Sequence, residues 1–108
     1  MEFKGTPGPW VADIRCGCCA VYQKNRANDA AGCHRDDDRN IVYSSKGARY
    51  DEKLGHWVMD EEAQANFTLI AAAPDLLNAL INLIEYLKLN ETAEAHAAMI
   101  AINKALGG

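Results

Sequence analysis

The chain has 108 residues, 49% of them hydrophobic, and a formal net charge of −4 from 11 basic and 15 acidic side chains. This length corresponds to one domain, and the apolar fraction excludes a disordered tail and a collagen-like chain. No apolar run approaches the ~20 residues that cross a bilayer, and the first residues do not form a secretory signal. We therefore expect an intracellular protein with no membrane partner.

Charge and composition change near residue 59. Residues 1–59 hold nine Lys and Arg against eight acids, whereas residues 60–108 hold two against seven. Both Trp and all four Cys lie in the first segment, and the second is rich in Ala, Leu and Ile. We expect an α+β fold in a single domain, 1–108, with β-sheet and loops in residues 1–59 and helices in residues 60–108.

Four segments of the first half have strand patterns. In residues 10–16, Trp10, Ala12, Ile14 and Cys16 fall on one face, which is the period of a half-buried strand. Residues 19–23, 40–44 and 55–59 are the other candidates, and residues 24–39 are polar and predict a long loop. The segments together predict a small antiparallel sheet of three or four strands.

Three helices are expected in the second half. Asp60 is a helix N-cap, and the first helix ends near Ala73 because Pro74 favours the first position of a new helix. The second helix runs to Leu87 with an apolar arc of roughly 160° at 100° per residue. Asn90 is the expected N-cap of a third helix that ends near Leu106.

The third helix predicts self-association. Ala93, Ala97, Ile100 and Ala101 lie on one side, and Met99, Ile102 and Leu106 lie on nearly the opposite side. A monomer of this size cannot readily cover both faces, and large exposed apolar patches mark association sites. We expect a homo-oligomer that forms through the helices. The alternative is that the Ala-rich side tolerates water and the end of the chain frays.

Two motifs carry a resemblance. Thr6-Pro7-Gly8-Pro9-Trp10 lies near the start, and residues 66–77, Asn-Phe-Thr-Leu-Ile-Ala-Ala-Ala-Pro-Asp-Leu-Leu, lead into the second helix. The pair resembles a family of small phage and prophage accessory proteins with a TPGPW-type motif and an N-x-x-LIAAAP-x-LL-type helix junction. Phe67, Thr68 and Asp75 depart from the usual pattern. The resemblance implies a phage-encoded protein in the cytoplasm of a bacterial host, and it supplies provenance rather than mechanism.

Trp10, Arg15 and Asn66 are the candidate ligand-binding residues. Trp10 follows a Pro-rich entry and suits the end of a core, and Asn66 lies at the margin of an apolar stripe, where a buried amide needs partners. The structural alternative is that Trp10 plugs the core and Asn66 ties a helix to a strand.

The cysteines form an incomplete metal signature. Cys16 and Cys19 make a C-x-x-C, and Cys33 with His34 or His56 would complete a tetrahedral zinc site. Cys33 and His34 are adjacent, however, and adjacent residues seldom ligate one ion together. We expect no cofactor, with zinc on Cys16, Cys19, Cys33 and His34 as the alternative, and free thiols otherwise.

No catalytic motif is present: the sequence has no G-x-S-x-G, no Gly-rich phosphate loop and no H-E-x-x-H. The first half is too evenly charged for strong duplex nucleic-acid binding. Our leading hypothesis is a non-enzymatic phage protein that binds a host protein or a small anionic host molecule to counter host defence, including sequestration of a nucleotide signal. The alternatives are a zinc-stabilised protein- or nucleic-acid-binding module and a small hydrolase.

Overall fold

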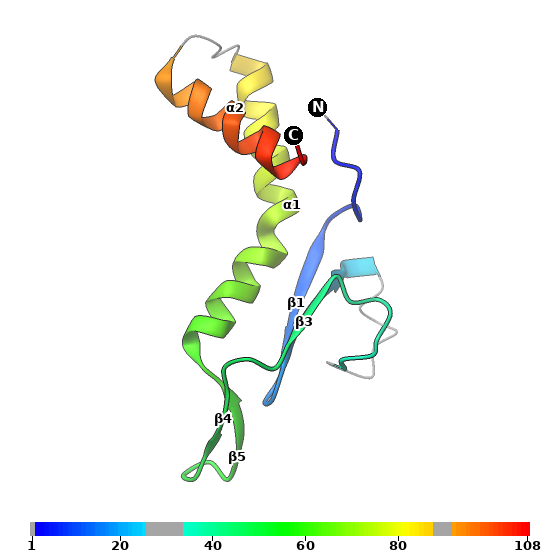
Figure 1. Cartoon of the computed structure of the whole chain (residues 1–108), viewed down its shortest axis with the longest axis vertical. Coiled ribbons are helices and arrows are strands. Elements are labelled where there is room, and N and C mark those ends of the chain that lie inside the picture. Colours follow the sequence, from blue (N-terminus) through cyan, green and yellow to red (C-terminus); the bar gives the residue numbers. More distant parts are fainter. Residues whose placement is uncertain (1, 26–33, 88–91) are drawn as a thin grey trace.

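The computed structural model describes residues 2–25, 34–87 and 92–108. The long helix α1 runs beside the strands in its first half, and a second helix crosses it toward its C-terminal end (Figure 1). The strands are β1 (Trp10–Ile14), β2 (Cys19–Gln23), β3 (Val42–Ser44), β4 (Ala48–Asp51) and β5 (His56–Met59), and the helices are α1 (Glu61–Leu87) and α2 (Ala93–Ala105). The α+β class is confirmed, but the count of helices and the division of the strands differ from the prediction.

β2 is the central strand of a three-stranded antiparallel sheet in the order β1-β2-β3. Four of its five residues are buried, because α1 packs against one face and the Arg39 side chain lies 5.3 Å above the Tyr22 ring on the other. A strand that is covered on both faces has a continuous apolar run, and Cys19-Ala20-Val21-Tyr22 is such a run. This strand was predicted with its observed limits.

The core between this sheet and α1 is one cluster of buried side chains. Trp10 and Ala12 of β1 pack against its edge, as the predicted alternation requires, whereas Ile14 is exposed and Cys16 lies beyond the strand. The buried members of the cluster are Cys19, Val21, Met59, Ala63 and Phe67.

Asp60 joins the strands to α1 and caps the helix, as predicted. Its Oδ1 accepts a hydrogen bond from the Ala63 N–H at 2.8 Å, and its own N–H donates to the Gly47 carbonyl at 2.9 Å. Gly47 has a φ of +94°, and a Cβ at this position would lie 2.8 Å from the Asp60 carboxylate. Glycine is therefore required where the turn before β4 approaches the start of α1.

The helix break predicted at Pro74 is wrong, because α1 is one helix of 27 residues and the described chain contains two helices, not three. An internal proline removes a hydrogen bond and crowds the preceding turn at a cost of about 3 kcal/mol. Packing offsets this cost. Pro74 is buried, and a Cβ added to Gly8 would lie 2.7 Å from its Cβ. The Pro-rich entry segment therefore packs directly on the helix at Pro74.

The prediction of one sheet of three or four strands is also wrong, because β4 and β5 form a separate two-stranded antiparallel sheet. β4 was not predicted, although its sequence, Ala-Arg-Tyr-Asp, alternates apolar and polar side chains, because the alternation extends over only four residues. The turn between the strands depends on Asp51, whose Oδ1 accepts from the N–H groups of Lys53 at 2.9 Å and Leu54 at 3.0 Å. Gly55 closes the turn at a φ of +74°.

α2 packs one of its two apolar sides on α1. Thr92 is its N-cap and accepts a hydrogen bond from the Ala95 N–H at 3.0 Å, whereas the cap expected at Asn90 falls outside the described residues. Ala95 and Ile102 are buried together with Ile81 and Ile84 of α1 in a second core cluster. Ile100, on the other side of α2, is exposed.

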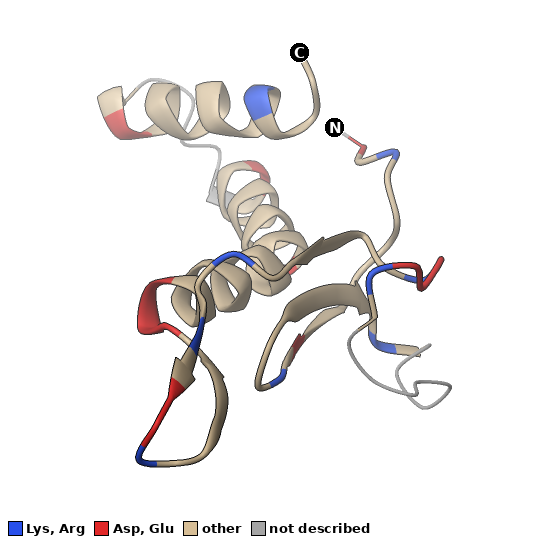
Figure 2. Cartoon of the chain, turned by 60° about the horizontal axis from the view of Figure 1, so that its bottom comes forward, with Lys and Arg blue, Asp and Glu red and all other residues tan. Residues whose placement is uncertain are grey.

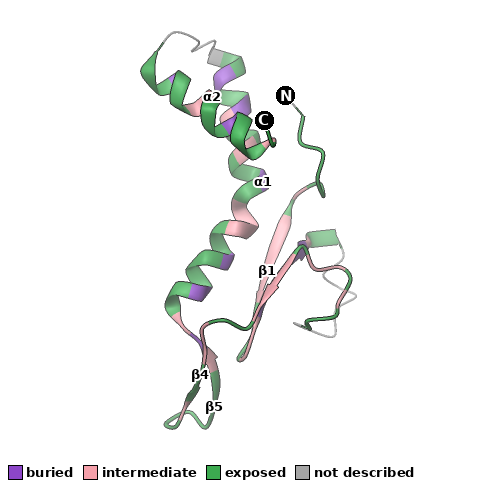
Figure 3. Ribbon diagram, in the orientation of Figure 1, coloured by how far each residue is buried: buried purple, intermediate pink, exposed green. Residues whose placement is uncertain are grey.

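The chain exposes far more surface than its size requires (Figure 3). The radius of gyration is 17.1 Å and the extents are 55 × 28 × 20 Å, whereas a compact domain of this length has a radius of about 13 Å. The accessible surface is 7678 Å², against about 5,900 Å² for a compact monomer of this mass. The excess of roughly 1,800 Å² lies within the range that one chain contributes to a large oligomeric interface.

One segment, Glu61–Tyr86 of α1, is long and apolar enough to cross a membrane by length and composition, since an 18-residue window within it has a mean hydropathy of 1.6. The expectation that no run approaches this length was therefore wrong. Core helices of soluble proteins satisfy the same two criteria, so length and apolarity alone assign no membrane role.

We expect Gly8→Ala to destabilise the protein by about 1 to 3 kcal/mol, because the added methyl group collides with Pro74 and one element must shift. Gly17→Ala is the matched control, since nothing lies within 4 Å of a Cβ there. Both changes replace one glycine by alanine, so the difference in urea-unfolding free energy between the two variants reports mainly the contact with Pro74. Equal stabilities of the two variants would show that the entry segment does not pack on Pro74.

Candidate functional site

Trp10 is anchored at the end of the core nearest the N-terminus. Its Nε1 donates to the Thr6 carbonyl at 3.1 Å, and its ring meets Phe3 edge-on at 6.3 Å between centroids. With Pro74 and other apolar residues it lines a cavity of about 190 Å³. This position matches the structural alternative, in which Trp10 closes the core.

Arg15 lies beyond the far end of β1 and belongs to a polar network. Its Nε donates to Asp13 Oδ1 at 2.6 Å, and Tyr22 Oη donates to the other Asp13 oxygen at 2.7 Å. Burial raises the pKa of Asp13, but the hydrogen bonds from Arg15 and Tyr22 outweigh burial and lower the pKa below its usual 3.8. The carboxylate therefore stays ionised and holds the Arg15 guanidinium at the strand end.

Asn66 is exposed on the first half of α1 and lines a different cavity from that of Trp10. The structure therefore does not bring Trp10, Arg15 and Asn66 into one pocket. The Asn66 cavity has a volume of about 300 Å³ and mixes one cation with two carboxylates, and one of these, Asp60, caps α1. It is lined by Ser44, Lys46, Gly47, Asp60, Glu62, Ala63, Asn66 and Phe67.

The residues of the metal hypothesis have different surroundings. Cys19 is fully buried in the core, where burial raises the pKa of its thiol and disfavours the thiolate that binds metal, and Cys16 is exposed. Cys18 is disulfide-bonded.

The structure describes only one of the other two candidate ligands. His34 is exposed and its Nδ1 accepts a hydrogen bond from the Asp36 N–H at 3.2 Å, and Cys33 falls outside the described residues. Across residues 2–25, 34–87 and 92–108, no three His, Cys, Asp or Glu side chains gather as a metal site.

The surface that the sequence analysis missed is one face of the β4–β5 hairpin. Tyr50 and Trp57 are cross-strand partners, with ring centroids 5.9 Å apart in an edge-on arrangement. They are 52% and 53% exposed. Ala48 pairs with Met59 on the same face, and Met59 is buried in the core. The hairpin face is thus an extension of the core-facing surface, and we call Tyr50 and Trp57 the aromatic face.

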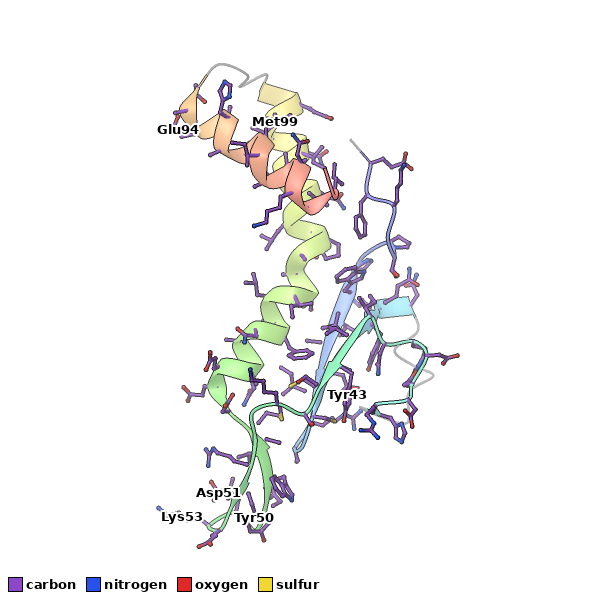
Figure 4. The ribbon with its side chains drawn as sticks, in the orientation of Figure 1. Tyr43, Tyr50, Asp51, Lys53, Glu94 and Met99 are labelled. Atoms are coloured by element: carbon purple, nitrogen blue, oxygen red, sulfur yellow. The ribbon has the colours of Figure 1, made fainter. Side chains whose placement is uncertain are left out.

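The hairpin projects from the end of the molecule that is opposite α2, and Tyr50, Asp51 and Lys53 lie near its tip (Figure 4). Leu54 in its turn is 59% exposed. Trp57 also borders an open depression of about 470 Å³ with Gly17, Ser45 and Ala48. Two-stranded hairpins are marginally stable alone, and exposed aromatic pairs are typical of interface anchors. The sequence signal that could have located this face is the pair Tyr50 and Trp57, which are separated by six residues and lie at equal distances on either side of the turn.

The charges of the β half largely neutralise one another (Figure 2). Three arginines pair with an aspartate two residues away: Arg15 with Asp13, Arg39 with Asp37, and Arg49 with Asp51 at 3.8 Å. The bond from Arg39 strongly lowers the pKa of Asp37. Paired arginines contribute little net field for an anionic ligand.

We expect Asp13→Asn to lower the unfolding free energy by about 1 to 2 kcal/mol near neutral pH, since it removes a charged hydrogen-bond acceptor from Arg15 and Tyr22. Because the folded pKa of Asp13 is depressed, its contribution is complete above its unfolded pKa and is lost as the pH falls below that value. Urea titrations at neutral and acidic pH should show the gap from wild type closing in acid. Exposed Asp38→Asn is the control, and a gap that persists in acid would contradict this account.

A family model described as Salmonella phage P22 protein Y8K6 matches residues 1–108. No curated protein and no solved structure matches the chain. The match confirms the phage origin that the resemblance implied, while it does not test the two motifs themselves. Since it covers the whole chain, the protein belongs to the family of Salmonella phage P22 protein Y8K6.

Proposed function

We propose that the protein is a non-enzymatic phage protein of the bacterial cytoplasm that captures a host protein with the aromatic face of its β4–β5 hairpin. The proposal depends on one observation: Tyr50 and Trp57 form a half-exposed aromatic pair on a projecting hairpin. Covering the exposed half of two such rings contributes roughly 4 to 6 kcal/mol of gross apolar stabilisation. This is enough to anchor a protein interface.

A protein target is favoured over a small anionic molecule by the surrounding charges. A nucleotide signal requires cationic side chains that are available for its phosphates. Arg15, Arg39 and Arg49 are each paired with an aspartate, and the cavity near Asn66 contains two carboxylates beside Lys46. Exposed Trp and Tyr side chains are instead typical of an energetic centre in a protein interface.

Homo-oligomerisation through the helices is the second part of the proposal. The surface excess of roughly 1,800 Å² over a compact monomer supports it. The exposed leucines of α1, Leu69, Leu76 and Leu83, also support it, because they form apolar surface on a helix that a second copy can cover without contacting the hairpin. Assembly through the helices leaves the aromatic face free for the target.

We expect Trp57→Ala to weaken target binding roughly ten-fold or more, because truncation of a central aromatic anchor costs about 2 kcal/mol or more. The measurement is affinity capture from a lysate of infected bacteria, followed by titration of the captured protein. Ile100→Ala truncates an exposed apolar side chain of α2, away from the hairpin, and should bind as wild type does. The identity of the captured protein decides whether the target belongs to host defence.

The proposal fails if Trp57→Ala and wild type bind the same protein equally. It also fails if a panel of linear and cyclic nucleotides raises the melting temperature of wild type and of Trp57→Ala alike. That second result would favour nucleotide sequestration at another site.

A further inference from the structure

α1 has a second apolar face that the other described elements, β1–β5 and α2, leave largely exposed. Leu69, Leu76 and Leu83 recur every seven residues and are 63%, 54% and 49% exposed. Ala72, Ala79 and Tyr86 recur at the same spacing, three residues after each leucine. Positions that alternate by three and four residues form the contact line of a coiled coil. We call these six residues the Leu/Ala seam.

The seam lies nearly opposite the side that α1 buries in its own fold. The buried side consists of two further seven-residue repeats, with Phe67, Pro74 and Ile81 in one and Ala63, Ile70, Leu77 and Ile84 in the other. At 100° per residue, the centres of the two faces are about 150° apart. Leu69 and Leu76 also line the groove between α1 and α2, but the strands and α2 leave about half or more of each seam leucine exposed. Polar residues such as Asp75 and Asn82 border the seam on the other side.

We propose that the seam pairs α1 with the α1 of a second copy of this chain, in antiparallel orientation. This inference deepens the proposed function, because it rests on the assembly proposed there and assigns the surface that performs it. The seam extends over about 26 Å from Leu69 to Tyr86. A helix with the same seven-residue repeat matches such a line, and the accessible surface of the whole chain, roughly 1,800 Å² above that of a compact monomer, is of the size that one chain buries in a stable pair.

A lipid surface is a poorer occupant. α1 contains no Lys or Arg to meet lipid phosphates, and its charged residues are all acidic. Asp75, Asn78 and Asn82 would also lie near the middle of any buried span, where each carries a desolvation cost.

The antiparallel orientation follows from side-chain size and charge. With the crossing centred near residues 77 and 78, Leu76 of each copy lies opposite Ala79 of the other, and Leu83 lies opposite Ala72, so that large residues meet small ones. Tyr86, which is 85% exposed, then lies opposite Leu69, at the mouth of the apolar groove of about 370 Å³ between α1 and α2. A parallel pair would instead place the Asp75 carboxylates and the acidic first turns of the two copies side by side.

The first test is Leu76→Glu, measured by analytical ultracentrifugation. Leu76 is already exposed in the single chain, so the variant should keep the wild-type circular dichroism and melt as a folded monomer at concentrations where wild type is a dimer. Leu54→Glu adds the same charge at an exposed leucine of the hairpin turn and should remain dimeric.

Each outcome has a defined meaning. A dimeric Leu76→Glu variant overturns the seam but leaves the proposed assembly intact. A monomeric wild type overturns both the seam and the proposed assembly, whereas hairpin binding is decided separately by Trp57→Ala. Sedimentation of wild type, but not of Leu76→Glu, with phosphatidylcholine/phosphatidylglycerol vesicles would show that a bilayer covers the seam, and would overturn the pairing.

The second test measures orientation by electron spin resonance. A nitroxide on Glu61→Cys, in a Cys16→Ser background, should give an inter-label distance of about 50 Å in an antiparallel pair and below about 20 Å in a parallel one. A short distance would overturn the orientation.

Discussion

The structure depends on the packing of small elements along one side of a helix that is longer than any of them. α1 has 27 residues and so extends about 40 Å. The three-stranded sheet covers its first half around Phe67, and α2 covers its last turns around Ile81 and Ile84. Two separate core clusters result, and Pro74, on which the Gly8 segment packs, lies between them along α1. Because every covering element lies on this side, the opposite side of α1 stays exposed.

Sequence patterns correctly predicted those elements that depend on a few neighbouring residues. The limits of β2 and the Asp60 cap agree with the sequence, because a continuous apolar run and a capping side chain act over a few residues. The fate of Pro74 depends on Gly8, 66 positions earlier in the chain, which no local pattern reports. β4 has only four alternating residues, and it forms a strand because it pairs with β5 and because Asp51 stabilises the turn between them.

The candidate site was harder to predict than the fold. Trp10, Arg15 and Asn66 were selected for their residue types, but Trp10 and Arg15 lie at opposite ends of β1 and Asn66 of α1 lines a different cavity from that of Trp10. Cys19 belongs to an attractive spacing with Cys16, yet the strand period turns its thiol into the core. The aromatic face needs the register of β4 on β5, since Tyr50 and Trp57 meet only across the ladder. A pairing register is a long-range property.

Antiparallel pairing has a consequence for how a target is bound. The β4–β5 hairpin leads directly into the first turn of α1, so pairing along the seam would place the two hairpins at opposite ends of the dimer, about 50 Å apart. Two distant, outward aromatic faces cannot enclose one small molecule. They can engage two copies of a protein or two sites on an oligomer, and such double engagement raises the apparent affinity without any new contact. The geometry of the pair and the chemistry of the hairpin thus favour the same class of partner, a host protein that itself presents its binding surface more than once.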